Sequence, residues 1–126
     1  MAIKYTVTEK SSPLQPQQPK KWYANSKSEG DVTLRALGKE IAARSTVAPA
    51  DTQAVLVALT EVLTEHLAES KIVRLGDFGA FQVSISSAGA ETKEKFNASL
   101  IKSGKVVFRP GIDIREMLKN LKYEKA

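Results

Sequence analysis

The residues best suited to a chemical role are the cations between residues 86 and 109. This segment holds five basic side chains against two acidic ones, Glu91 and Glu94, which gives it a net charge of +3. Lysine and arginine at this density can neutralise the phosphates of a nucleic acid. The five basic residues are Lys93, Lys95, Lys102, Lys105 and Arg109.

The charge of the whole chain is distributed unevenly. Residues 1–30 carry five lysines and two glutamates, residues 31–70 carry three basic and six acidic residues, and residues 71–126 carry eleven basic and six acidic residues. A polyanion would therefore be attracted to the last section. The alternative is a solvated surface that is basic without binding a polyanion.

Residues for other chemistries are missing. The chain has no cysteine, which excludes disulfides, thiolate metal sites and a cysteine nucleophile. His66 is the single histidine and has no cluster of ligands around it in the sequence, so it is predicted to be a surface or packing residue. We therefore expect no enzyme activity, cofactor, metal or small-molecule substrate. Neither a signal peptide nor a membrane span is recognisable, so a cytoplasmic protein is expected.

A pair of glycines and a change of periodicity organise the second half of the chain. Gly76 and Gly79 suit a tight turn within a strand predicted from about residue 71 to residue 86. Phe81, Val83 and Ile85 alternate with polar residues, which is typical of a half-buried strand. A return strand is predicted at about 100–109, and the polar segment between the strands should project into solvent.

Three helices are predicted, at about 33–45, 49–70 and 112–121. The second is roughly 30 Å long at about 1.5 Å per residue. One 13-residue helix cannot cover so long an apolar helix, so a second copy of the chain is expected to complete the core. The main apolar stripe of the helix predicted at 49–70 consists of Leu56, Leu59, Leu63 and Leu67.

The first 31 residues differ from the rest in composition. Residues 3–8 alternate like a short strand, whereas residues 11–31 contain three prolines and are predicted to be an extended strap. Trp22 and Tyr23 could stack on bases, although the favoured interpretation is that they pin the strap to its own core. The predicted domains are 1–31, a strand and a proline-rich strap, and 32–126, whose arm covers about 86–104.

Two short motifs, together with this order of elements, carry a family resemblance. They are Gly76-Asp77-Phe78-Gly79-Ala80-Phe81 and Phe108-Arg109-Pro110-Gly111. Over about residues 32–122 the chain resembles the HU/IHF family of bacterial histone-like DNA-binding proteins, whose signature is close to Gly-Phe-Gly-Thr-Phe followed by Phe-x-Pro-Gly. Asp77 is an extra residue here, and Ala80 replaces the threonine. The N-terminal extension is similar to that of the divergent HU-type branch typical of Bacteroidetes.

The resemblance implies both a fold and a function. The fold would be α+β: an HU/IHF-like intertwined homodimer with a two-helix base, a β-sheet with a projecting arm, and a short C-terminal helix. The function would be that of an architectural, nucleoid-associated protein that binds and bends double-stranded DNA with low sequence specificity. The DNA-binding residues expected on this basis are Lys93, Lys95, Phe96, Asn97, Lys102, Lys105 and Arg109.

The arm departs from the family pattern. Ser84, Ser86 and Gly89 stand at outward positions that are basic in HU, and no proline lies between Ser84 and Arg109. Phe96 could replace the wedge proline of the family, or it could pack against the arm or the strap. Arg109 could contact phosphate or pair with an acidic residue of the second helix. The alternative function is a protein-interaction module that kept the fold and lost tight DNA binding.

Overall fold

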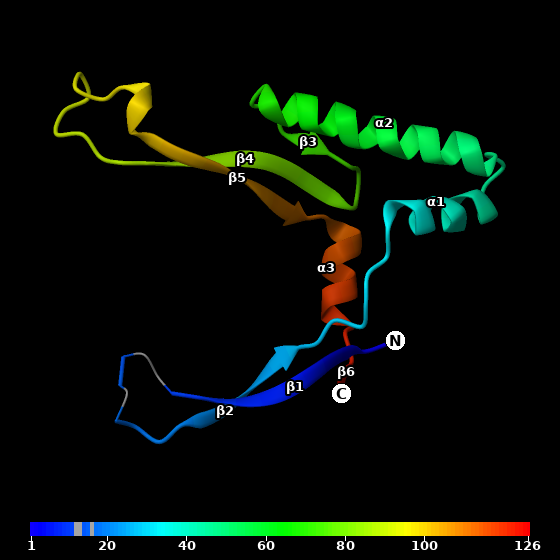
Figure 1. The fold of residues 1–126 in the computed structure, drawn as a ribbon, viewed down its shortest axis with the longest axis horizontal. Coiled ribbons are helices and arrows are strands. Elements are labelled where there is room, and N and C mark those ends of the chain that lie inside the picture. Colours follow the sequence, from blue (N-terminus) through cyan, green and yellow to red (C-terminus); the bar gives the residue numbers. More distant parts are fainter. Residues whose placement is uncertain (12–13, 16) are drawn as a thin grey trace. The chain divides into compact units, whose positions relative to one another are not determined.

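The structure is a computed structural model that describes residues 1–11, 14–15 and 17–126, and it divides into two compact units (Figure 1). The terminal unit contains Met1–Thr33 and Met117–Ala126, and the central unit contains Leu34–Glu116. The C-terminal ten residues therefore group with the N-terminal strands, whereas the sequence assigned them to the same domain as residues 32–116.

The terminal unit is a three-stranded sheet in the order β2-β1-β6. Strand β1 (Ile3–Lys10) confirms the short strand predicted from the alternation at residues 3–8. Strand β2 (Lys21–Ser26) pairs antiparallel with β1, so the prediction of an extended strap is wrong for these six residues. Strand β6 (Tyr123–Lys125) pairs in parallel with β1 and was not predicted. The strap positions 12, 13 and 16 lie outside the described residues.

The central unit begins with two packed helices, α1 (Leu34–Ala43) and α2 (Pro49–Ala68), close to their predicted positions. Gly38 is the buried residue of α1, and the side chain of Gln53 occupies the space where a Cβ of residue 38 would lie. Gln53 Nε2 also donates a hydrogen bond to the carbonyl oxygen of Arg35, at 2.8 Å. The close approach of the two helices thus depends on the missing side chain at Gly38.

Helix α2 has one half-buried face and one exposed face. Thr52 is buried and Leu63 is half-buried, whereas Val55 and Val62 are 63% and 46% exposed. No hydrophobic side chain among the described residues is fully buried. The apolar core of the central unit is therefore open on one side. None of the helices in the described part of the chain is long and apolar enough to span a membrane.

A second sheet, in the order β3-β4-β5, completes the central unit. The strand predicted at 71–86 is in fact two strands, β3 (Val73–Arg74) and β4 (Gly79–Ser87), joined by the glycine turn. Strand β5 (Ile101–Pro110) returns antiparallel to β4 and leads into α3 (Ile112–Lys119). We call β4, β5 and the connection between them the arm.

Candidate nucleic-acid interface

The base of the arm is a joint between the glycine turn and the end of β5. The amide of Gly111 donates to the carbonyl of Phe78 at 2.9 Å, and the amide of Asp113 donates to the carbonyl of Asp77 at 3.1 Å. The ring of Phe108 lies 5.5 Å from that of Phe78, centroid to centroid. The two motifs found in the sequence therefore contact each other directly, and they fix where the arm starts.

Glycine at position 79 is required for this joint. Gly79 has φ = 151°, a backbone conformation that side-chain-bearing residues rarely adopt. A Cβ at this position would lie 2.5 Å from the carbonyl oxygen of Arg109 and 2.6 Å from the ring of Phe108. The missing side chain lets β4 and β5 meet at the point where the arm leaves the helices.

The register of β4 and β5 gives the arm two chemically different faces. Phe81 pairs with Phe108, and Val83 pairs with Val106, so these residues share an apolar face. The neighbouring positions form the opposite face, which we call the polar face. It contains Ala80, Gln82, Ser84 and Ser86 from β4 and Ser103, Lys105, Val107 and Arg109 from β5.

Two arginines lie in one row across the polar face. Arg74 of β3 pairs with Ala80 of β4, and Ala80 pairs with Arg109 of β5. Their Cα atoms are separated by two strand spacings, or about 10 Å. Because Ala80 is small, a shallow hollow opens beside the two arginines. Planar guanidinium groups in such an arrangement suit the phosphates of a polyanion.

The structure also answers the alternative role suggested for Arg109. Among the described residues, neither Arg74 nor Arg109 forms an ion pair with a carboxylate. The alternative pairing of Arg109 with an acidic residue of α2 is therefore not found in this part of the chain. Both guanidinium groups remain available for an external anion.

Lys105 extends this row along the arm. It pairs with Ser84 on the polar face, four residues from Arg109, which corresponds to about 13 Å along a strand. Lys102 is the extra residue of a β-bulge, because Ser86 pairs with Ser103 while Ser87 pairs with Ile101. Serines line the rest of this stretch, and the hydroxyls of Ser86 and Ser103 lie 3.2 Å apart. The charged groups of the polar face in β4 and β5 are thus Lys105 and Arg109, with Gln82 and Val107 between them.

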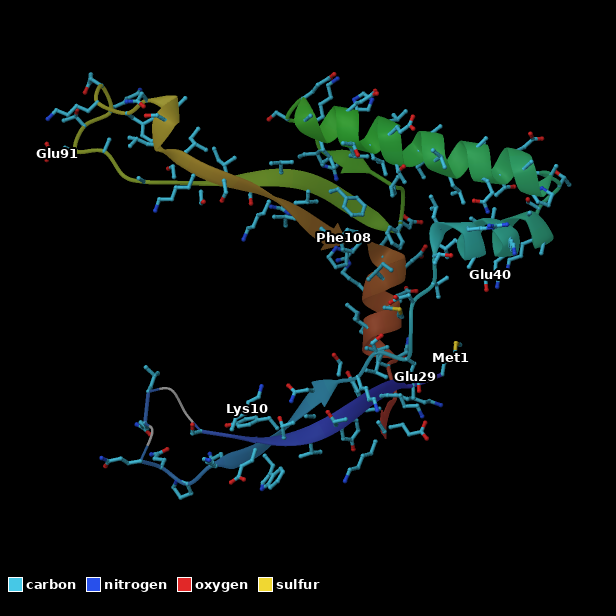
Figure 2. All side chains as sticks on the ribbon, viewed as in Figure 1. Met1, Lys10, Glu29, Glu40, Glu91 and Phe108 are labelled. Carbon is cyan, nitrogen blue, oxygen red and sulfur yellow. The ribbon has the colours of Figure 1, made fainter. Side chains whose placement is uncertain are left out.

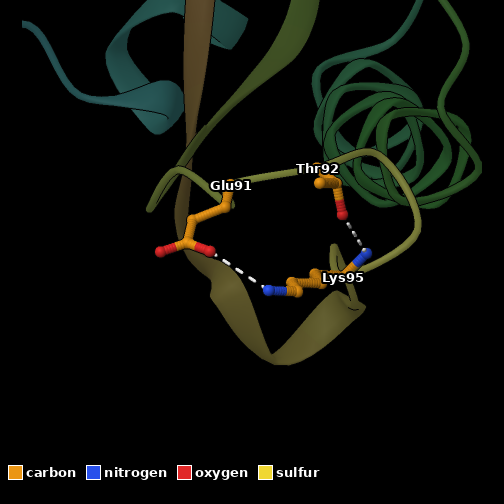
Figure 3. A network of polar contacts seen from close by, with 3 residues as sticks. All are labelled: Glu91, Thr92 and Lys95. Carbon is orange, nitrogen blue, oxygen red and sulfur yellow. Dashed lines mark hydrogen bonds and ion pairs between the residues drawn. The ribbon is translucent and has the colours of Figure 1, made fainter.

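The tip of the arm is organised by local polar contacts (Figure 3). Lys95 Nζ lies 3.1 Å from a carboxylate oxygen of Glu91, and the backbone amide of Lys95 donates to Thr92 Oγ1 at 3.3 Å. Glu91 is seen at the far end of the arm from Phe108 (Figure 2). The ion pair offsets the charge of Lys95, although both groups are solvent-exposed and such pairs are weak.

Asn97 has a structural role at the tip. Its side-chain oxygen accepts hydrogen bonds from the backbone amide of Ser99, at 3.0 Å, and from the Ser99 hydroxyl. It thereby caps the short 3-10 helix η1 (Ala98–Leu100). Phe96, the preceding residue, is 41% exposed. An exposed ring beside a capped turn is compatible with a wedge, and the DNA contact stays a prediction.

The predicted site residues therefore fall into two groups. Lys105 and Arg109 lie on the polar face, with Lys102 at the bulge beside it. The tip carries Lys93, Lys95, Phe96 and Asn97, which the structure does not bring to the polar face. Arg74 was missed by the sequence analysis. The spacing of Gly76 and Gly79 was the available signal, because a tight turn there pairs residue 74 with residue 80.

Comparisons with known proteins identify a family and a similar fold. The family described as "HU domain fused to wHTH, Ig, or Glycine-rich motif" matches residues 1–125. No curated protein sequence matches the chain. A crystal structure from Bacteroides vulgatus ATCC 8482, described as a "Putative bacterial DNA binding protein", is similar with a TM-score of 0.68 and 13% sequence identity. The match covers 98% of this chain and 47% of that one, so this chain spans about half of its length.

Proposed function

Since the chain belongs to the family of HU domains fused to wHTH, Ig or glycine-rich motifs, we propose that it binds duplex DNA through the polar face of its arm. The observation that carries this proposal is the row of Arg74 and Arg109, which Lys105 extends, with no acidic partner among the described residues. In this proposal the protein acts at the bacterial nucleoid by binding DNA, and it catalyses no reaction.

Low sequence specificity follows from the kind of groups on the polar face. Its cations are spaced for phosphates, which position a protein without reading sequence. Gln82 and Val107 lie between the arginine row and Lys105, and Ser84 Oγ is buried without a hydrogen-bond partner. Gln82 is the one long amide side chain on the polar face, so direct reading of base edges would rest on a single residue in this proposal.

A homodimer is the second part of the proposal. Exposed apolar residues occur on α2 and on the apolar face of the arm, for example Leu59 (40% exposed) and Ile85 (64% exposed). A stable soluble protein does not leave so much apolar surface in water. A second copy of the central unit would bury these residues and present two arms to the same DNA.

A steep salt dependence is the test of this function. We expect binding to a random duplex of about 30 base pairs, measured by fluorescence anisotropy, to weaken by about 10³-fold or more between about 50 and 200 mM salt. Two arms that together contact at least six phosphates would release that many counterions. No binding at the lowest salt would refute the proposal and favour the protein-interaction module, which the short serines of the arm would suit.

Bending of the DNA depends on the tip in this proposal. If Phe96 inserts between base pairs, Phe96→Ala should lower the bend, measured as FRET between dyes at the two ends of the duplex. The proportional loss of affinity should be smaller than the proportional loss of FRET, because the phosphate contacts of the polar face remain. An unchanged FRET signal at saturating protein would show that Phe96 is not a wedge.

A further inference from the structure

The sheet of the terminal unit has two chemically different faces. The strand registers place Tyr5 and Val7 of β1 on the same face as Ala24 of β2. Trp22 and Tyr123 on this face are 66% and 67% exposed. We call it the aromatic face, and its residues are Ile3, Tyr5, Val7, Trp22, Ala24 and Tyr123.

The opposite face of the same sheet carries Tyr23 but is otherwise polar, and several of its polar groups satisfy one another. Asn25 donates to Thr8 Oγ1 at 2.6 Å and accepts from Lys10 Nζ at 3.3 Å. Lys4 Nζ pairs with a carboxylate oxygen of Glu124 at 2.7 Å. This face is therefore suited to water. The aromatic face is not, because a sheet with an apolar side needs a second layer to bury it.

We propose that the aromatic face packs against the aromatic face of a second copy of this chain. Its charges support a two-fold arrangement: Glu9 lies on this face toward one end of β1, and Lys125 lies beside Tyr5, toward the other end. Among the described residues, neither side chain has an ion-pair partner. A two-fold axis across the sheet would bring each Glu9 toward the Lys125 of the other copy.

The size of the aromatic face favours a second copy over an unrelated partner. Strand β1 pairs with β2 over six residues and with β6 over three, so the face is two strands wide along most of its length. It spans roughly 10 by 26 Å, and two such faces would bury about 500 Å² together. A stable interface that stands alone needs about 1,000 Å² or more. The contact is therefore too small to hold a free partner. Between two chains already joined by their central units, it forms at an effective concentration of about 1 mM.

This inference rests on the proposed homodimer, and cysteine cross-linking can test it separately. The chain has no cysteine, so single substitutions can be labelled cleanly. Val7→Cys lies in the middle of the aromatic face, and Thr8→Cys is an exposed control on the opposite face. With a short bis-maleimide and about 10 μM full-length protein, Val7→Cys should cross-link to itself on the order of 100-fold faster than a cysteine that meets its partner only at bulk concentration. It should also cross-link clearly faster than Thr8→Cys, which faces away from the contact in the same dimer.

Charge reversal sharpens the same experiment. Glu9→Lys in the Val7→Cys background should slow cross-linking, and adding Lys125→Glu should restore it, because the pair is then reversed on both copies. Trp22 is the only tryptophan, so its fluorescence reports directly on burial of this face. Its emission should be blue-shifted and shielded from acrylamide in the native protein, and Val7→Lys should remove both effects.

Each failure has its own signature. A dimer by sedimentation whose Val7→Cys and Thr8→Cys variants cross-link equally would overturn the sheet contact while leaving the homodimer intact. A monomer by sedimentation would overturn the homodimer and this inference together. Shielding of Trp22 that appears only when duplex DNA is added would also overturn it, in favour of bases stacking on the aromatic face.

Discussion

Replacing Arg74 and Arg109 together by alanine should weaken binding to a random duplex at about 0.1 M salt roughly 50-fold for each arm that contacts the DNA. Each neutralised phosphate contributes about 0.9 to the slope of log K against log salt concentration. If the contribution of a contact vanishes at about 1 M salt, losing that contact lowers the binding constant about eightfold at about 0.1 M. The two arginines flank Ala80 in one row and have no acidic partner among the described residues. The salt slope itself should fall by about 1.8 for each protomer bound.

A matched control separates a site from a general loss of charge. Lys39→Ala with Arg44→Ala removes two exposed cations from α1 and its C-terminal end and leaves the net charge equal to that of the arginine double variant. We expect it to weaken binding only a few-fold, through the long-range field alone. Equal losses in the two double variants, measured by anisotropy in the same buffer, would show that the arginine row is not a phosphate site.

Much of the central unit could be predicted because its signals are local. The apolar period of α2 and its first proline located that helix to within two residues of its observed end. The glycine turn was visible because Gly76 and Gly79 interrupt an apolar pattern, and both have positive φ. The resemblance to the HU family, drawn from two motifs that meet at the base of the arm, is confirmed by the match over residues 1–125.

The terminal unit was harder to predict because its strands depend on distant partners. Residues 21–26 follow a proline-rich stretch, and only their pairing with β1 makes them a strand. Strand β6 has three residues, too few for any alternation to be read. It joins β1 from more than 100 positions away, through pairs such as that of Ile3 with Tyr123. Neither strand has a sequence pattern strong enough to specify it alone.

The candidate site was predicted where it follows from alternation and missed where it depends on register. Alternation along β5 places Lys105 and Arg109 on one face, as the structure shows. Arg74 joins them only because the turn has the length that pairs it with Ala80. At the tip, the spacing of Glu91 and Lys95 allowed an ion pair, which the structure contains. Counting charges in the sequence could not distinguish Lys95, which pairs with Glu91, from the cations of the polar face.

Gly79→Ala should cause the largest loss of stability of any single glycine substitution in the arm. A side chain at φ = 151° costs about 1–3 kcal/mol in backbone strain. The new Cβ would also lie 2.5 Å from the carbonyl oxygen of Arg109, a backbone atom that cannot move without separating β4 from β5. We expect a total loss of about 3–5 kcal/mol, a large fraction of the stability of a small protein. Urea unfolding followed by circular dichroism would measure it.

Two other glycines separate the cost of backbone strain from the cost of the close Cβ contact. Gly76 has φ = 54° and no atom within 4 Å of its Cβ position, so Gly76→Ala should cost only the backbone term, about 1–2 kcal/mol. Gly89 has neither a positive φ nor a neighbour within 4 Å, so Gly89→Ala should change the unfolding free energy by less than about 0.5 kcal/mol. The expected order of loss is Gly79, Gly76, Gly89. If Gly79→Ala lost no more than Gly76→Ala, the close contact with Arg109 could not be what holds the two arm strands in place, and the position of the arginine row would need another explanation.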